Sequence, residues 1–427
     1  MNNLEERLEN IKNIYKDLDN YLNQFGDILP EDIKKNIKEK VLSDPELKKF
    51  IEDLESSRPP RFMIIGRTGA GKSSLINGFT GKYIADISHV GSCTKNTTKY
   101  DVRDASRILM EILDTRGIAE SIPVDEKIAA EEEVKNEMKG FSPDAVWYVL
   151  DATRRDDIQK DIELLKDLKA EYKRINHFEL PIIVVINKCD GLAPSREKDP
   201  AAYPVSKLGL IADIVAYYQD VFKKYDLPIP DDAIVPVSSY LEWEGALEGQ
   251  EQVKKIAFYG CYNMSELYLA LDKHLQDSSS KMGLRMSMRL MEVIKNLATK
   301  INNIISNIAA FIAASPIPVS DIYILFSLQM LLVMQIAYLS GRKITMDTAK
   351  EFIVSTMGIG LGGIALRVLA QQLPKFGNII YPGAGLVISA TIARQGTKAI
   401  GKAAIAYYIN SASLEEVKAA YQKENKE

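Results

Sequence analysis

The stretch RFMIIGRTGAGKSS, residues 61–74, constrains the fold of this chain more than any other. A short apolar run leads directly into the pattern G-x-x-x-x-G-K-S, and two prolines at 59 and 60 separate it from helical sequence upstream. The glycines allow backbone conformations in which successive N–H groups converge on phosphate oxygens at a helix N-terminus. The stretch therefore predicts a buried strand, a phosphate-binding loop (P-loop) and a helix in immediate succession.

Two side chains of this loop have roles that follow from their type. Lys72 would reach the β- and γ-phosphates of a nucleotide, and the hydroxyl of Ser73 would bind Mg²⁺. Backbone groups complete the phosphate contacts, and the predicted binding residues of the loop are Gly66, Gly69, Ala70, Gly71, Lys72, Ser73 and Ser74.

Four further apolar runs follow, separated by charged segments of helical period such as 156–174 and 205–225. They read RILMEILDT, AVWYVLDAT, LPIIVVINK and AIVPVSS. Continuous apolar runs suit strands buried on both faces, and alternation of strands with helices predicts an α/β fold with a doubly wound, mostly parallel sheet. On such a sheet, the P-loop and the loops after later strands meet at the carboxyl edge, where ligands bind.

An acidic residue at the end of a neighbouring strand would hold a metal-bound water. Asp114 begins DTRG, in which Gly117 lets its N–H approach a γ-phosphate. The span between Lys72 and Asp114 leaves room for one helix, a flexible loop and an edge strand. That loop, ADISHVGSCTKNTTKY, contains hydroxyls able to complete the Mg²⁺ shell, with Thr94 preferred and Thr97 or Thr98 as alternatives.

The sequence NKCD, residues 187–190, carries the base-specific chemistry. Asp190 can accept from the N1–H and 2-amino groups of guanine, two donors that adenine lacks, and a buried carboxylate left unpaired would discriminate against ATP. Lys188 would lie over the ring, and Asn187 would tie this loop to the P-loop. Ser238 and Ser239 would place backbone N–H groups near the guanine carbonyl.

Taken in order, GRTGAGKS, Thr94, DTRG, NKCD and the Ser-Ser pair resemble the five conserved elements of translation-factor-class GTPases. The resemblance covers residues 60–278 and is closest to Era/septin-like bacterial proteins of the YeeP and YfjP types, with a layout similar to dynamin-like and immunity-related GTPases. It implies binding of GTP and GDP with Mg²⁺, and hydrolysis of GTP to GDP and phosphate. Ser73, Thr94 and Asp114 would be the metal-binding residues.

Catalysis would need a residue other than the one that usually positions the attacking water. Where Ras-like proteins have a water-positioning Gln, this chain has Ile118, and Gly69 offers no side chain to bind a potassium ion. The predicted catalytic residues are Lys72, Thr94, Gly117 and, as a source of positive charge, Arg67. Arg116, Arg154 and Arg155 stay open as alternatives. We expect slow hydrolysis that accelerates on self-association as a homodimer or oligomer.

Both flanks of this segment are helical in pattern. We expect N-terminal amphipathic helices over 1–58, the α/β domain over 59–278 and a helical region over 279–427, with the two helical parts forming an all-α domain. A helix over 281–300 would present Lys281, Arg285 and Arg289 on one basic face. The segments SPIPVSD and PGAG…IGKA resemble the YcjF-type helical domain, which implies membrane association in some relatives.

The run 322–339 is uncharged over 18 residues, close to the minimum for crossing a bilayer. Gln329 and Gln335 interrupt it and favour a buried bundle helix. A GxxxG at 358–362 permits close helix packing, which fits the same bundle.

Charge is distributed unevenly. From Lys281 to the end there are 16 Lys and Arg against 8 Asp and Glu, a net +8, whereas the first 280 residues carry a net −12. A basic, apolar tail suits an anionic membrane surface, an acidic partner or the protein's own acidic part, and no pattern indicates nucleic acid. Three scattered cysteines and the absence of a signal-peptide pattern predict a cytoplasmic protein. The basic helical tail leaves open a peripheral contact with the inner face of the membrane.

Two further functions stay open. The chain could be a GTP-binding scaffold with negligible hydrolysis that oligomerises or anchors at a membrane through its helical domain. An ATPase or nucleotide kinase would use the same P-loop, although Asp190 disfavours it.

Overall fold

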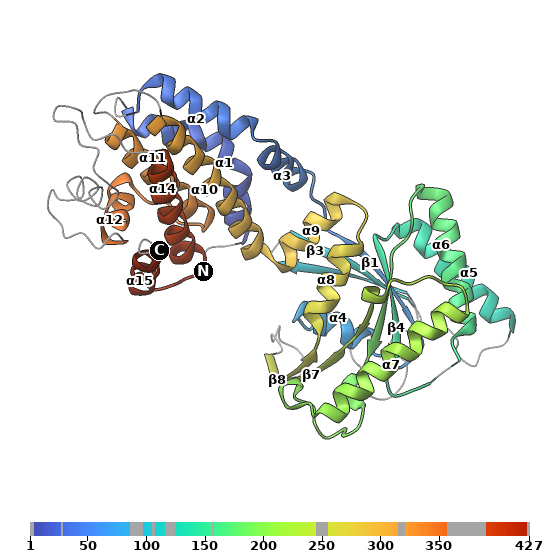
Figure 1. The fold of residues 1–427 in the computed structure, drawn as a ribbon. Helices are drawn as coiled ribbons and strands as arrows, with labels where there is room; N and C mark the ends of the chain where they lie inside the picture. The colour runs from blue at the N-terminus through green and yellow to red at the C-terminus, as the bar shows by residue number, and fades with distance from the viewer. Residues whose placement is uncertain are drawn as a thin grey trace, which may run out of the picture. The chain divides into compact units, whose positions relative to one another are not determined.

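The computed structural model describes residues 4–26, 29–85, 97–104, 107–115, 124–155, 157–244, 255–314, 321–356 and 390–424. The chain forms two compact units (Figure 1). One consists of Ser57–Met288, and the other combines Met1–Ser56 with Arg289–Glu427. Helices from the two ends of the chain thus share one unit, as the fold-class prediction proposed.

The unit Ser57–Met288 is built on a six-stranded sheet in the order β2-β3-β1-β4-β5-β6. The strands are β1 Arg61–Gly66, β2 Thr98–Asp104, β3 Arg107–Asp114, β4 Ala145–Asp151, β5 Ile182–Asn187 and β6 Ile234–Pro236. Neighbouring strands pair in parallel, apart from the antiparallel β2–β3 pair. The predicted doubly wound, mostly parallel sheet is confirmed, and β2 is the expected edge strand.

Helices cover both faces of this sheet. They are α4 Lys72–Thr80, α5 Val124–Phe141, α6 Gln159–Asn176, α7 Val205–Lys224, α8 Met264–His274 and α9 Ser278–Met288. The alternation along β1 shows how the two cores arise, because successive side chains of a strand point to opposite faces. Phe62 and Ile64 pack with buried residues of α4, α8 and α9, whereas Met63 and Ile65 pack with those of α5, α6 and α7.

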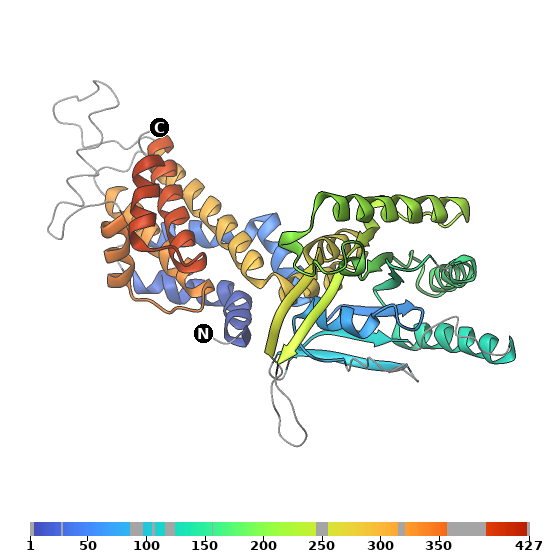
Figure 2. The same cartoon turned by 90° about the horizontal axis from the view of Figure 1, so that it is seen from below.

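A separate antiparallel hairpin of β7 Ser238–Glu244 and β8 Lys255–Tyr262 follows the sheet (Figure 2). It packs against α4 at Gly78, where an added Cβ would lie 3.2 Å from Ser239 Cβ and 3.3 Å from Cys261 Sγ. The sequence pattern did not predict this hairpin. Its first strand begins directly after Val237, within the apolar run that we had assigned to a single strand.

The basic helix expected over 281–300 is wrong as a single element. The structure has two helices there, α9 and α10 Leu290–Ala314, with Arg289 between them. Arg285 on α9 makes a bidentate ion pair with Asp272 of α8, at 2.6 and 2.9 Å. The α/β unit therefore continues to Met288, ten residues past the predicted boundary at 278, and the basic face is divided between two units.

The helical unit contains α1 Leu4–Gln24, α2 Glu31–Ser43, α3 Pro45–Glu55, α10, α11 Asp321–Leu339, α12 Met346–Thr356, α14 Ala390–Ala404, a π-helical turn Ile405–Ile409 and α15 Leu414–Glu424. Helix α1 is fastened to the end of α11, since Tyr338 Oη donates to Asp17 Oδ2 at 2.6 Å and Asn10 Nδ2 donates to the Tyr338 carbonyl at 3.1 Å. Helices α10 and α14 approach closely at Gly401, where a Cβ would lie 2.1 Å from Asn302 Oδ1.

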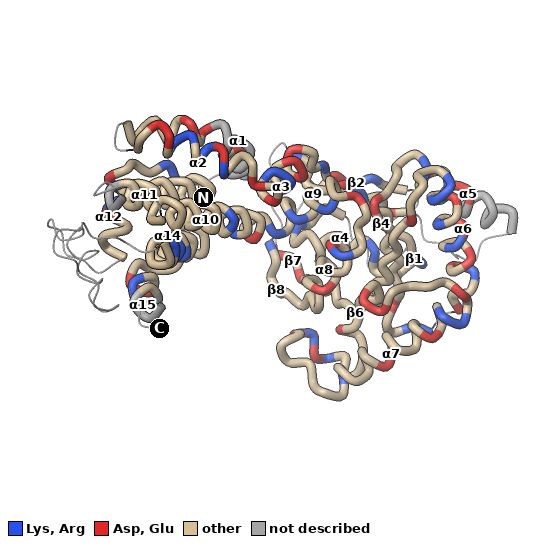
Figure 3. The backbone as a smooth tube through the Cα atoms, turned by 45° about the horizontal axis from the view of Figure 1, so that its top comes forward, with Lys and Arg blue, Asp and Glu red and all other residues tan. Residues whose placement is uncertain are grey.

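The apolar helices of this unit are largely buried within it. Every described residue of α11 from Ile324 onward is buried except Phe326, including Gln329 and Gln335, and few charges mark α11 in Figure 3. Among the described helices, Leu290–Ala314 alone is long and apolar enough to cross a membrane. Of its most apolar 18-residue stretch, 61% is buried within the structure. The GxxxG at 358–362 and the PGAG segment lie outside the described residues.

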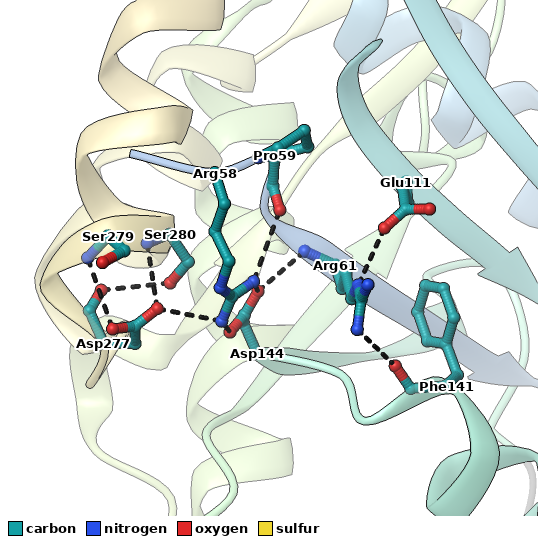
Figure 4. Close-up of polar contacts among 9 residues, drawn as sticks. All are labelled: Arg58, Pro59, Arg61, Glu111, Phe141, Asp144, Asp277, Ser279 and Ser280. Carbon is teal, nitrogen blue, oxygen red and sulfur yellow. Dashed lines mark hydrogen bonds and ion pairs between the residues drawn. The ribbon is translucent and has the colours of Figure 1, made fainter. Parts of the chain in front are cut away.

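At the amino edge of the sheet, Arg58 joins three segments of the α/β unit (Figure 4). Its guanidinium donates to both oxygens of Asp144, at 2.8 and 2.5 Å, and pairs with Asp277 at 2.9 Å. Asp144 precedes β4 and also accepts from the Arg61 N–H at 2.8 Å, while Asp277 accepts from the backbone of Ser280 at the start of α9 at 3.1 Å. One arginine thus holds β1, β4 and α9 together.

We expect Arg58→Met to lower the free energy of unfolding of this unit by roughly 2–3 kcal/mol, because the Asp144 side chain is only 7% exposed and would lose its charged partner. Both tryptophans, Trp147 and Trp243, lie in this unit, so their fluorescence during urea unfolding reports on it alone.

Arg174→Met is the matched control, since Arg174 is also bidentate to a carboxylate, that of Glu171, but is 69% exposed. It should lower the free energy of unfolding far less than Arg58→Met does, because exposed ion pairs contribute little to stability. The double variant Arg58→Met/Asp144→Asn should cost less than the sum of its single substitutions, and strict additivity would contradict this account.

Candidate functional site

The P-loop has the predicted shape. It follows β1 directly and ends at the N-terminus of α4, with Gly69 and Gly71 in left-handed conformations at φ of +81° and +86°. The Lys72 ammonium donates to the Gly66 carbonyl at 3.1 Å, so the side chain folds back over the loop. A cradle of backbone N–H groups at a helix N-terminus with an adjacent ammonium binds phosphates.

Ser73 and Asp114 come together from different elements, as predicted. Ser73 lies in the first turn of α4 and Asp114 ends β3, and Ser73 Oγ lies 3.4 Å from Asp114 Oδ2. The parallel register that pairs Ile64 with Asp114 places this carboxylate beside the P-loop. A hydroxyl and a fully buried carboxylate are hard oxygen ligands, which is the donor set that Mg²⁺ takes beside phosphates.

The NKCD loop is locked to the P-loop at one point. Asn187 ends β5, and its Nδ2 donates to the carbonyls of Ala70 at 3.1 Å and Gly71 at 3.3 Å. A Cβ on Gly71 would lie 2.6 Å from that nitrogen, so only glycine fits. Ser239 Oγ donates to Asn187 Oδ1 at 3.0 Å and fixes the amide orientation. The predicted tie between the two loops therefore appears in the structure.

Asp190 has two side-chain partners. Ser238 Oγ donates to Oδ1 at 3.0 Å, and Lys198 Nζ donates to Oδ2 at 2.7 Å. Cys189 beside it is a buried thiol whose pKa burial raises to about 12, which makes it a packing residue. The two serines thus act here through their hydroxyls, which position Asp190 and Asn187, whereas the sequence argument had used only their backbone N–H groups.

Lys188 spans from the NKCD loop across the P-loop to β4. Its backbone adopts a left-handed conformation at φ +64°. A Cβ added to Gly71 would lie 3.6 Å from the Lys188 Cε, and the Lys188 ammonium pairs with Asp151 at 2.8 Å. Burial raises the pKa of Asp151, but donation from Lys188 and Thr153 outweighs it, so the net pKa is lowered. Asp151 stays ionised and anchors the lysine whose aliphatic stem lies across the loop.

Among the described residues, Arg67 of the P-loop and Arg154 beside it differ in their partners. Arg67 pairs with the buried carboxylate of Asp161 on α6, at 3.1 and 3.3 Å, and Asp161 also accepts from Tyr148 Oη at 2.8 Å. Arg154, in the loop after β4, pairs with Asp151 at 3.8 Å, is 60% exposed at its side chain, and places Nη1 4.0 Å from where a Cβ on Gly69 would be. Arg67 thus braces the P-loop against α6, and Arg154 lies over its open side.

Several residues that shape this site were not predicted. Asp151 and Asp161 act through contacts with residues distant in sequence, whereas Lys198 and Lys207 act on the loop that contains Asp190. Lys207 is the residue that sequence reasoning missed most clearly. It is fully buried on α7, and burial lowers its pKa, although the sequence of α7 has the pattern of an ordinary amphipathic helix. A lysine in line with the apolar positions Ile211, Ile214 and Tyr218 was the signal that could have revealed it.

The predicted residues Thr94 and Gly117 lie outside the described residues, as do Arg116 and Ile118. Their roles therefore stay predictions. Ala70 and Ser74 lie in the P-loop and in α4, as expected.

Comparison with known proteins agrees with this geometry. Residues 61–188 match the family described as 50S ribosome-binding GTPase. The tRNA modification GTPase MnmE of Clostridioides difficile is 26% identical over 241 residues, 55% of this chain and 44% of that protein. GTPase Der of Bacteroides thetaiotaomicron is 30% identical over 133 residues, 31% of this chain and 28% of that protein. The chain thus spans less than half the length of these curated relatives.

Solved structures resemble it only loosely. Era of Aquifex aeolicus bound to GDP·AlF4⁻ gives a TM-score of 0.31 at 22% identity, covering 58% of this chain and 67% of that one. The bacterial dynamin GTPase LeoA from ETEC gives 0.35 at 13% identity, covering 100% of this chain and 95% of that one. These scores add no argument beyond the family match.

The family match and the site agree on one class of domain. P-loop NTPases hold Mg²⁺ with the P-loop hydroxyl and a strand-end aspartate, as Ser73 and Asp114 are placed to do. The expected cofactors, GTP or GDP with Mg²⁺, are those of this class. The chain therefore carries a P-loop GTPase domain, a GTP-binding G domain, within the unit Ser57–Met288.

Proposed function

We propose that this protein hydrolyses GTP to GDP and phosphate, and that the change of nucleotide acts through the helical unit. The observation that carries the proposal is the contact between Gly71 and Asn187, which locks the phosphate loop to the loop that would read guanine. A base held by Asp190 then fixes where the phosphates lie. Such positioning supplies much of the catalysis in phosphoryl transfer.

The described residues divide the work by their chemistry. Lys72 and the P-loop N–H groups would bind the β- and γ-phosphates and stabilise charge that develops on them. Ser73 and Asp114 would hold Mg²⁺, which supplies further charge neutralisation when bound. Thr94 and Gly117 remain the proposed switch residues that would contact the metal and the γ-phosphate.

We place the catalytic arginine at Arg154 rather than Arg67. Arg67 is engaged with a carboxylate that is only 2% exposed, and releasing it would leave Asp161 buried without its charged partner. Arg154 is 60% exposed and makes a pair with Asp151 at 3.8 Å. Releasing it would leave Asp151 with its closer partner Lys188, at 2.8 Å, so Arg154 can reach the phosphates of its own nucleotide or those of a second copy beside Gly69. This position fits hydrolysis stimulated by self-association through the nucleotide face.

The helical unit would be the effector. Its basic residues on α14, Arg394, Lys398 and Lys402, suit an anionic membrane surface or an acidic partner. The alternative is a GTP-binding scaffold with negligible hydrolysis, which would assemble or bind membrane through the same unit. Phosphate release measured with and without anionic liposomes separates these two hypotheses. A GTPase releases phosphate in at least one of the two measurements, whereas a scaffold releases none in either.

Gly71→Ala should weaken binding of a fluorescent GDP analogue at least about tenfold, since the substitution adds left-handed strain and a contact at 2.6 Å with Asn187. Gly81→Ala at the other end of α4 is the control. It has the same kind of strain, at φ +66°, but no atom within 4 Å, so stability should fall while affinity stays unchanged. An equal loss of GDP affinity in both variants would contradict the proposed role of the contact between Gly71 and Asn187.

Arg154→Ala should lower the single-turnover rate of GTP hydrolysis by roughly 10²-fold and leave GDP affinity within about twofold, because its charge is needed mainly in the transition state. Arg67→Ala should instead lower the thermal stability of the G domain. A rate loss in Arg67→Ala with an unchanged rate in Arg154→Ala would reverse the assignment.

The turnover number should rise with protein concentration if hydrolysis depends on self-association. Phosphate release per molecule, measured from about 0.1 to 50 μM protein, should increase in the range where light scattering detects a nucleotide-dependent dimer. A turnover number that stays constant across a range in which the dimer forms would contradict stimulation by self-association.

A further inference from the structure

The carboxylate that reads guanine is already engaged on its outer side. Asp190 is 10% exposed at its side chain, with Ser238 fully buried against Oδ1 and Lys198 against Oδ2. Lys198 is the more exposed of the two partners, at 34%. Oδ2 therefore has the more solvent-accessible partner, and it is the oxygen that a base could claim by displacing the ammonium.

The position of Lys198 is built into the fold. The loop between β5 and α7 folds around the ammonium of Lys207, which donates to the carbonyls of Asp190 at 2.7 Å, Glu197 at 2.8 Å and Pro194 at 3.4 Å. A buried cation thereby fixes both Asp190 and the residue directly before Lys198.

The β7–β8 hairpin supports the same lysine from the other side. Lys198 Nζ lies 5.1 Å from the centroid of the Tyr240 ring, in a cation–π contact. The Lys198 carbonyl lies 3.1 Å from where a Cβ on Gly260 would be, so the loop and the hairpin are in close contact. Two independent elements thus hold Lys198 over Asp190.

Guanine and Lys198 make the same kind of bond to Asp190. Guanine offers two neutral N–H donors, and an ammonium is the stronger donor to a carboxylate. Adenine has no donor at the corresponding positions and cannot replace the lysine, whose loss would leave the carboxylate uncompensated.

We propose that Lys198 is a displaceable counter-ion that competes with guanine for Asp190, so that base binding requires exchange of one donor for another. The proposal rests on guanine recognition by Asp190. It makes Lys198 a specificity-determining residue that slows association of every nucleotide and that only a base with donors can displace productively.

The test is stopped-flow association of a fluorescent GDP analogue with the full chain. Lys198→Met should raise the association rate about tenfold and lower the Kd for GDP by a similar factor, while Lys198→Arg, which keeps the charge, should not. Arg196→Met is the matched control, because Arg196 belongs to the same loop, is 86% exposed and, among the described residues, pairs with its neighbour Glu197 alone. It should change the rate less than twofold.

An association rate in Lys198→Met equal to that of Arg196→Met, or weaker GDP binding, would overturn the proposal, since the lysine would then remain bonded while the base binds. Tryptophan fluorescence confirms folding of each variant, and Lys198→Gln replaces Lys198→Met if the latter does not fold.

Asp190→Asn separates this proposal from the recognition of guanine itself. That variant should shift preference from GDP to XDP, because the amide donates where the carboxylate accepts. If the wild type does not bind GDP, or Asp190→Asn shows no shift, the guanine assignment fails. If both hold and Lys198→Met behaves as its control, only the role of Lys198 fails.

Discussion

The parallel register of buried strands is the constraint on which the site depends. Pairing of β1 with β3 and of β4 with β5 brings Asp114 beside the P-loop strand and Asp151 beside Asn187. Each of these residues ends its strand, so one shift in register would move a polar group away from the others and turn its apolar neighbours to the wrong face. The hydrophobic cores on both faces fix this register, and thus the site geometry.

The sequence predicted those parts of the structure that local pattern encodes. Apolar runs identified β1, β3, β4, β5 and β6. The motifs at and after their carboxyl ends identified Lys72, Ser73, Asp114, Asn187 and Asp190. These inferences succeed because a P-loop and a strand-end carboxylate are specified by a few neighbouring residues. Their mutual contacts then follow from the topology of a parallel sheet.

Contacts between distant segments could not be predicted in this way. Nothing local to Arg58 indicates that it bridges Asp144 and Asp277, and nothing near Arg67 indicates the carboxylate of Asp161. The break at Arg289 was missed for a related reason, since α9 and α10 have continuous helical sequence and separate because each packs in a different unit. Such features depend on tertiary packing that one sequence does not display.

The shared unit of N- and C-terminal helices has a consequence for synthesis on the ribosome. Residues up to Met288 emerge while α11, the partner of α1, and α10, the partner of α2, have not yet been made. At about 5–20 residues per second, synthesis of Arg289–Glu427 takes roughly 10–30 s. During that interval the amphipathic N-terminal helices lack the partners that cover their apolar faces, although the G domain is already complete, so we expect a chaperone to bind them.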